Sequence, residues 1–248
     1  MIVLRSDDEI ASIREAGKIL AATLNKLKAC AKPGVKTKEL DDIARQEILR
    51  RNGYPAFKDY KGYPANICTS VNEVVVHGIP SERKLREGDI VSIDIGVKFR
   101  DYFADAAVTL GVGKISEAAE KLMRVTKEAL EIGIESALPN KRLFDISAKI
   151  QEHVESNGFS VVRVFVGHGI GTNIHEDPEV PNFGRPGTGP RLEPGMILAI
   201  EPMVNAGTYD VEILEDGWTA VTKDRQLSAH FEHTIAIHKD GFEILTTE

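Results

Sequence analysis

The chain has 248 residues, of which 42% are hydrophobic and 28% charged, and its formal net charge is −7. This composition is typical of a globular protein with an extensive core, and the negative charge argues against general nucleic-acid binding. The N-terminus lacks the apolar core of a signal peptide, and no stretch approaches the roughly 20 apolar residues that span a bilayer. We therefore expect a cytoplasmic protein that binds neither nucleic acid nor membrane. Two cysteines are too few for a disulfide framework, so both are expected to be reduced.

Apolar residues at helical spacing predict two pairs of helices. The first helix begins at Ser6, which forms a capping-box pattern with Glu9, and ends at Lys32-Pro33-Gly34. The four helices are predicted at residues 6–32, 40–52, 116–138 and 143–157. Strand-like runs follow each pair, at residues 66–76, 89–110, 160–166, 196–205 and 230–238. This order predicts an α+β fold, in which helices cover one face of antiparallel sheets.

Two strand-like segments far apart in the chain have similar sequences. When "LREGDIVSIDIG" is aligned with "LEPGMILAIE", Asp94 falls on Glu201, 107 residues later. A second landmark, an Asn-Gly pair that ends a predicted helix, repeats at nearly the same interval. Because solenoid and propeller repeats are much shorter, this period indicates two related halves. We expect one domain over residues 1–248, with halves of about 1–112 and 113–248.

Asp94 lies among the β-branched residues of a predicted buried strand. If the chain reverses at Phe99-Arg100, Asp105 faces Asp94 directly on the returning strand. Directly opposed side chains are about 4.5 to 5.5 Å apart at Cβ, so two carboxylates would repel unless a cation lies between them. A protonated pair and a surface hairpin are the alternatives that these two acids leave open. Phe99-Arg100 also lacks the glycine or asparagine that two-residue hairpins prefer, so a longer loop is a further alternative.

Three more side chains that bind metals lie on or at the ends of apolar strands: His168, Glu201 and Glu232. Each alone is explained more simply as a packed histidine or a solvent-facing glutamate. The repeat changes this balance, because superposing Asp94 on Glu201 brings both strands to one central seam. Five such ligands are too many for one tetrahedral zinc and suit two divalent ions bridged by carboxylates. The ligand types do not discriminate among Mn, Fe, Co and Zn.

The sequence resembles the methionine aminopeptidases, specifically the short bacterial type I form, over nearly its whole length. The motifs that carry the resemblance are "NEVVVHGIP", "DIVSIDIG", "FADAAVT", "GHGIGTNIHEDP", "GMILAIEPM" and "FEHTI". The resemblance implies a pseudo-twofold "pita-bread" fold, with a central antiparallel sheet and two helices per half on its outer face. It also implies hydrolytic removal of the N-terminal methionine from nascent polypeptides when the second residue is small.

The resemblance implies a role for each of the five ligands. Asp94 would bind one metal, and His168 and Glu201 the other. Asp105 and Glu232 would bridge the pair. A water between two divalent ions has its pKa lowered toward neutrality. The resemblance suggests Glu201 as the group that takes its proton and returns one to the leaving amine.

Two histidines on predicted turns, His77 and His175, would line the substrate side without being permanent ligands. The resemblance implies that His77 holds the scissile amide nitrogen, and that His175 helps to polarise the carbonyl and to stabilise the oxyanion. The α-amine of the substrate would bind at the Asp94 metal, which explains why only the N-terminal residue is cut. For both histidines the alternative is a solvent-exposed residue in a loop, although functional residues concentrate there.

The segment "FKDYKGYPANIC" resembles the family's methionine-pocket segment. The candidate walls of the pocket are Phe57, Tyr60, Tyr63, Cys68, Ile174 and Trp218, and the alternative for each is ordinary core. Three positions depart from the commoner bacterial pattern: Phe57 is often cysteine, Ile174 phenylalanine and Gly96 threonine. The hairpin segment "RDYFAD" also lacks the glycines of the familiar "DGYHGD". These departures affect the pocket shape and the turn, and leave the ligand set complete.

Two alternative functions remain from the sequence. An Xaa-Pro aminopeptidase or prolidase shares the implied fold and metals but usually carries an additional N-terminal domain, which we do not expect here. A non-catalytic pita-bread binding protein is disfavoured because all five ligands are present. Transient proximity to the ribosome is implied, although no zinc-ribbon extension or long insertion between His175 and Glu201 marks a docking element. We expect a monomer.

Overall fold

The computed structural model describes residues 1–247 and contains the four predicted helices. They are α1 (Asp7–Cys30), α2 (Thr37–Arg50), α3 (Glu117–Glu135) and α4 (Leu143–Ser156). The capping box at the start of α1 is confirmed: the Glu9 N–H donates to Ser6 Oγ, and the Ser6 N–H donates to Glu9 Oε2 at 2.8 Å. Acidic residues in the first turn of α1 add a favourable interaction with the helix dipole.

The strands of the first half are β1 (Tyr54–Pro55), β2 (Cys68–Val71), β3 (Val74–Val76), β4 (Ile90–Phe99) and β5 (Tyr102–Gly111). A short 3₁₀ helix, η1 (Tyr60–Gly62), lies between β1 and β2. The second half contains β6 (Ser160–Val161), β7 (Gly167–Gly169), β8 (Glu176–Val180), β9 (Ile197–Ile200), β10 (Met203–Asn205), β11 (Val211–Ile213), β12 (Ala220–Thr222), β13 (Ser228–His230), β14 (His233–His238) and β15 (Gly241–Ile244). Every pair of these strands is antiparallel, as predicted.

Some strand boundaries differ from those predicted. The run at 160–166 forms only the two residues of β6, after which the chain continues irregularly to β7. Strands β1, β7, β8, β11, β12 and β15 lie outside the predicted runs. The sequence of β8 contains a proline and three acidic residues, which are uncommon in strands. The predicted run at 230–238 is divided into the end of β13 and the whole of β14.

The predicted register of the β4–β5 hairpin is wrong. Asp94 pairs with Ala107, and Asp105 pairs with Gly96. The loop is one residue later than predicted, because Phe99 pairs with Tyr102 and Arg100 adopts a left-handed conformation with φ 55°. Moving the loop by one residue shifts the register by two, and side chains two residues apart point to the same face of a strand. Both carboxylates therefore still share one face.

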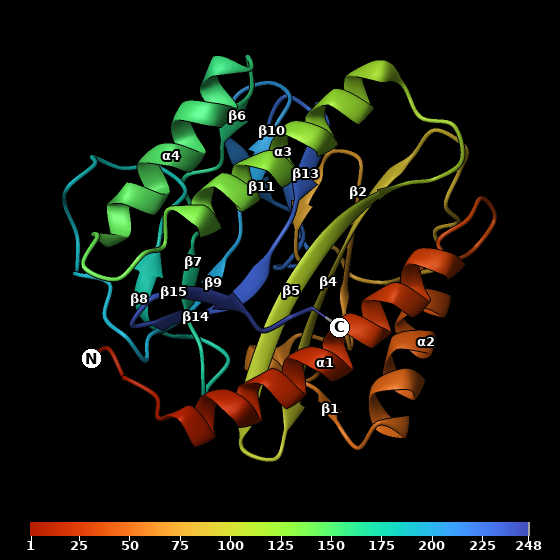
Figure 1. Cartoon of the computed structure of the whole chain (residues 1–248). Helices are drawn as coiled ribbons and strands as arrows, with labels where there is room; N and C mark the ends of the chain where they lie inside the picture. The colour runs from red at the N-terminus through yellow and green to blue at the C-terminus, as the bar shows by residue number, and fades with distance from the viewer. Residues whose placement is uncertain (248) are drawn as a thin grey trace.

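Helices α1 and α3 lie across the face of the sheet that contains β4 and β5, as Figure 1 shows. On β4, Ile93 and Ile95 are fully buried in the core beneath α1 and α2. A second core lies beneath α3 and α4 and includes Leu122, Ile150 and Leu198. Each such side chain contributes about 1.5–3 kcal/mol on burial. Because side chains alternate along a strand, packing of Ile93 and Ile95 against the helices directs Asp94 to the opposite face.

The two halves meet where β5 runs beside the chain that connects β13 to β14. The Glu232 N–H donates to the Ala107 carbonyl at 2.9 Å. Asp105 N–H donates to Thr234 Oγ1 at 3.0 Å, and that hydroxyl donates back to the Asp105 carbonyl at 2.8 Å. These bonds bring Asp105 of one half beside Glu232 of the other. Among residues 1–247, no helix is long and apolar enough to cross a membrane.

Candidate metal centre and active site

The second half contributes three ligands to the seam. His168 lies on β7, Glu201 directly follows β9, and Glu232 precedes β14. Asn182 Nδ2 donates to the Glu201 carbonyl at 3.0 Å and so holds its backbone. His168 Nδ1 donates to the Gly169 carbonyl at 2.9 Å, so Nε2 is the ring nitrogen directed toward the cluster. Such a hydrogen bond fixes the tautomer and orientation that a metal-binding histidine needs.

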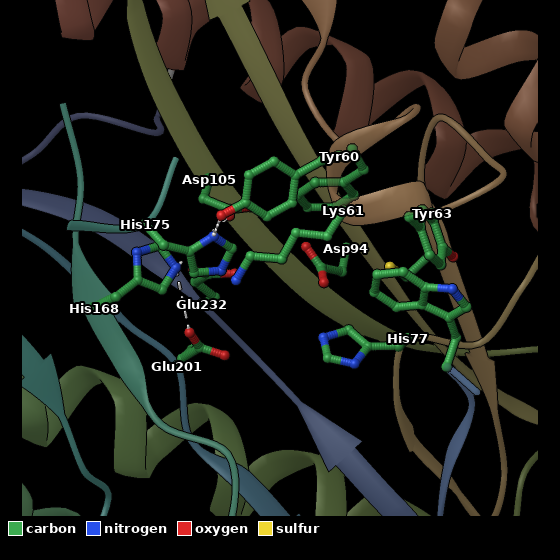
Figure 2. Close-up of a pocket in the computed structure, with 13 residues that line it drawn as sticks. Tyr60, Lys61, Tyr63, His77, Asp94, Asp105, His168, His175, Glu201 and Glu232 are labelled. Carbon is green, nitrogen blue, oxygen red and sulfur yellow. Dashed lines mark hydrogen bonds and ion pairs between the residues drawn. The ribbon is translucent and has the colours of Figure 1, made fainter. Parts of the chain in front are cut away.

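All five predicted ligands line one cavity of about 170 Å³, shown in Figure 2. His168 Nε2 lies 3.6 Å from Glu201 Oε1 and 4.0 Å from Asp105 Oδ2. Ligand atoms of Asp105, His168 and Glu232 all lie within 4.8 Å of one another. Asp105 and Glu232 are 127 positions apart in the sequence and belong to different halves. The strands nevertheless bring them close enough to share a cation.

Burial makes the four carboxyl groups unusually basic. It raises the pKa of Asp94 and of Glu201 to about 7, with the negative charge of Glu201 adding to the effect on Asp94. The pKa values of Asp105 and of Glu232 are raised well above their ordinary values. Burial is the larger cause, and the negative charges of the neighbouring carboxylates are the second. Four buried acids without a positive partner are electrostatically unfavourable.

The acids also contain oxygen atoms that lack partners. Within residues 1–247, Asp94 Oδ1, Asp105 Oδ1 and Glu232 Oε1 are buried and accept no hydrogen bond. Buried polar atoms are normally satisfied, and buried carboxylates are normally paired or bound to a metal. Divalent ions fit both the orphaned oxygens and the mixed carboxylate-imidazole set.

The two predicted substrate histidines lie on opposite sides of this cavity. His77 follows β3 with φ 60°, and its ring packs edge-on against Phe165 and Trp218, at centroid distances of 5.3 and 6.2 Å. His175 precedes β8, and its Nδ1 is hydrogen-bonded to the Tyr60 hydroxyl at 3.0 Å. Burial lowers the pKa of His77 to about 4 and that of His175 to about 3. Both rings are therefore neutral near pH 7, and each carries one N–H for a substrate.

An apolar slot adjoins the acids. The Tyr63 ring lies between Phe57 and Trp218, with edge-on centroid distances of 6.5 and 5.1 Å. The Tyr63 hydroxyl donates to the carbonyls of Ile67 and Gly78, so the ring is fixed. Cys68 pairs with Asp94 across β2 and β4, which places the slot directly beside the cluster. Burial raises the pKa of the Cys68 thiol, which is therefore an uncharged wall.

Ile174 differs from the other predicted pocket residues because it does not line the cavity. Ile174 is 2% exposed. Its side chain fills the space that is left because residue 96 is glycine. A Cβ added to Gly96 would lie 2.7 Å from Ile174 Cδ1 and 2.7 Å from Phe57 Cε1. Ile174 therefore packs behind Phe57, and borders a separate hollow beside Tyr60 and His175.

Two residues of the site were not found from the sequence. His230 is 2% exposed, and its Nε2 lies 3.5 Å from Glu201 Oε2. Its position two residues before Glu232 was a usable signal, because strand residues i and i+2 share a face. Lys61 also lines the cavity, and a lysine in a loop gives no comparable signal.

Comparisons with known proteins agree with this geometry. The profile of metallopeptidase family M24 matches residues 11–239. The methionine aminopeptidase of Clostridium perfringens is 58% identical over 99% of both chains. The crystal structure of methionine aminopeptidase from Thermotoga maritima superposes with a TM-score of 0.99, at 48% identity over 100% of both chains.

The fold extends to more distant enzymes. The prolidase from Pyrococcus furiosus superposes with a TM-score of 0.80 at 20% identity, over 99% of this chain and 66% of the prolidase. This likeness concerns the fold alone, and it supports the predicted pita-bread architecture. The family match over most of the chain and the high identity over its full length show that the chain belongs to metallopeptidase family M24 and, within it, to the methionine aminopeptidases.

Proposed function

We propose that this protein is a metal-dependent hydrolase that releases the N-terminal methionine of polypeptides whose second residue is small. The observation that carries the proposal is the aromatic end of the cavity, which lies beside Asp94 and is lined by Tyr63, Cys68 and Trp218. An unbranched thioether suits such a slot, since sulfur makes favourable contacts with aromatic rings. A relative with 58% identity carries the name methionine aminopeptidase, which supports the same substrate.

We propose that two divalent ions are held by the five ligands together: Asp94, Asp105, His168, Glu201 and Glu232. The orphaned carboxylate oxygens and the fixed tautomer of His168 support this assignment. When bound, such ions polarise a carbonyl and lower the pKa of water. The ligand types leave Mn, Fe, Co and Zn open.

Three residues are proposed to act on the substrate. Glu201 moves the proton, taking it from the attacking water and giving one to the leaving amine. The N–H of neutral His175 donates to the carbonyl oxygen and so stabilises the negative charge that develops there. His77, on the other side of the cavity, holds the scissile amide nitrogen.

The same geometry supports cleavage after the first residue only. A side chain that fills the slot places its own backbone beside Asp94, because Cys68 of the slot pairs with Asp94 across the strands.

Further proposals concern the whole protein. Residues 1–248 form a single catalytic domain of two halves, about 1–112 and 113–248, and act as a monomer in the cytoplasm. The substrates are the N-termini of nascent polypeptides. The protein binds them transiently near the ribosome.

Chelation followed by addition of one divalent ion at a time tests the proposed function. Methionine release from Met-Ala-Ser should disappear on chelation and return with at least one of Mn, Fe, Co or Zn. Ala-Pro and metal-free samples serve as controls. Activity confined to Ala-Pro would overturn the substrate, and full activity in protein that elemental analysis shows to be metal-free would overturn the mechanism.

A further inference from the structure

Lys61 is the one lysine or arginine among the thirteen described residues that line the cavity. Figure 2 shows its side chain extending across the cavity toward His175 and the acidic cluster. The residue as a whole is exposed, so its ammonium lies at the mouth. The roles proposed above make no use of it.

The backbone around Lys61 is held in a tight turn. Lys61 has φ 49°, and Asp59 and Gly62 on either side are also left-handed, with φ 65° and 88°. The turn is closed by hydrogen bonds from the Asp59 N–H to the Tyr63 carbonyl and from the Tyr63 N–H to the Tyr60 carbonyl, both 2.9 Å. The left-handed conformation is unfavourable for a residue with a side chain, so these hydrogen bonds must hold it. Because the loop is fixed, Lys61 is held between Tyr60 and Tyr63, which both line the cavity.

The contacts of Tyr60 show on which side of the mouth the ammonium lies. Lys61 Nζ is 5.3 Å from the centroid of the Tyr60 ring, and that ring stacks on His175 at 5.3 Å. The slot walls Tyr63 and Trp218 contact each other on the other side. The ammonium is thus on the His175 side of the cavity, away from the slot walls.

Within the described part of the chain, Lys61 forms no ion pair with an acidic side chain. Its neighbour Asp59 is within 3.9 Å of Lys58 instead. A lysine is a compact charge on a flexible stem, which suits a carboxylate whose position varies from one substrate to another.

We infer that Lys61 is a specificity-determining residue that binds an acidic side chain at the third residue of the substrate. The inference rests on the proposed function, in which methionine occupies the slot and a small second residue lies beside the acids. The third residue is then the first whose side chain can reach the mouth. A solvent-exposed ion pair of this kind changes affinity by about twofold to fivefold at low ionic strength, and salt weakens it.

The test measures kcat and KM for C-terminally amidated Met-Ala-Glu-Ser, Met-Ala-Gln-Ser and Met-Ala-Lys-Ser with metal-reconstituted protein. The wild type should favour Glu over Gln by about twofold to fivefold, through KM, and the preference should shrink in high salt. Lys61→Ala should remove the preference, and Lys61→Glu should make the Lys peptide the better substrate. Lys26→Glu, which changes the same charge on the exposed side of α1, should keep the wild-type order.

The outcomes separate this inference from the proposed function. Methionine release with a Glu-to-Gln ratio that Lys61→Ala and Lys61→Glu leave unchanged would overturn the inference alone. An equal loss of kcat for all three peptides would also overturn it, because it would show a structural or catalytic role. Failure of the wild type to release methionine from any peptide would overturn both.

Discussion

Gly96 lies directly opposite Asp105 in the β4–β5 ladder, and the space that a side chain at position 96 would fill contains Ile174 and Phe57. Three positions at which the sequence departs from the commoner bacterial pattern therefore contact one another. Phe57 fills the space from the slot side and Ile174 from behind, so neither could keep its position beside a larger residue at 96. The three departures form one packed unit on the metal-binding face, beside the acidic cluster.

Gly96→Ala should lower the free energy of unfolding by about 1–3 kcal/mol, because the new Cβ overpacks a buried site. The double variant Gly96→Ala/Ile174→Val should be more stable than Gly96→Ala, because it removes the Cδ1 atom 2.7 Å from the added Cβ. Urea unfolding of the two single variants and the double variant measures this coupling. Additive effects would show that Ile174 does not occupy the space beside Gly96.

Asp105→Asn should abolish stabilisation by divalent ions and yet raise the stability of the metal-free protein. The amide has the same shape as the carboxyl group but removes a buried charge that only a cation can compensate. At pH 8 the gain in the free energy of unfolding should be on the order of 1 kcal/mol or more. Thermal unfolding with chelator and with added Mn, Co or Zn measures both effects.

Asp101→Asn is the matched control for Asp105→Asn, since Asp101 is exposed in the loop of the same hairpin. It should leave both quantities unchanged. An Asp105→Asn protein that metal still stabilises as strongly as the wild type would show that Asp105 is not a ligand.

The sequence predicted those parts of the fold that depend on local signals. Capping at Ser6 and apolar periodicity located the helices within a few residues, and the isoleucines beside Asp94 identified its strand as buried. The hairpin loop was misplaced, because Arg100 adopts a left-handed conformation without the glycine or asparagine that usually indicates one. The two-residue shift left both carboxylates on one face, so the error did not affect which residues meet.

The missed features depend on tertiary contacts. Ile174 resembles a pocket residue in sequence, but its position behind Phe57 follows from the absence of a side chain at Gly96. Lys61 lines the cavity from a short turn, where nothing local distinguishes it from a solvated lysine. His230 contacts Glu201 from the end of β13, and only its spacing from Glu232 indicated this position.

The metal-free protein should become less stable as the pH rises from about 4 to about 7. The folded pKa of Asp94 and of Glu201 is about 7, whereas the unfolded values are about 3.9 and 4.3. In this window the folded state binds more protons than the unfolded state, so the free energy of unfolding falls with rising pH. Divalent ions compete with these protons, and their stabilising effect should grow over the same range.

Thermal unfolding at pH 5, 6, 7 and 8, with chelator and with a saturating divalent ion, measures this dependence. Replacement of both groups, Asp94→Asn/Glu201→Gln, should flatten the profile of the metal-free protein. A midpoint for the metal-free wild type that rises steadily from pH 5 to pH 8 would contradict burial as the dominant influence on these carboxyl groups.

His175→Ala should retain metal and lose most turnover. His175 is exposed by surface area, and its Nδ1 lies 3.0 Å from the Tyr60 hydroxyl. Partial desolvation in the cavity and neighbouring positive groups lower its pKa to about 3, so the neutral ring can donate one N–H. Loss of one donor that stabilises an oxyanion lowers kcat by roughly a hundredfold to a thousandfold. Elemental analysis and steady-state kinetics on Met-Ala-Ser measure metal content and turnover separately, and His153→Ala on the surface of α4 is the control. The His175 ring contacts the ring of His168 at a centroid distance of 4.2 Å and a tilt of 45°. A loss of metal from His175→Ala with normal folding would therefore instead assign His175 to the support of a ligand.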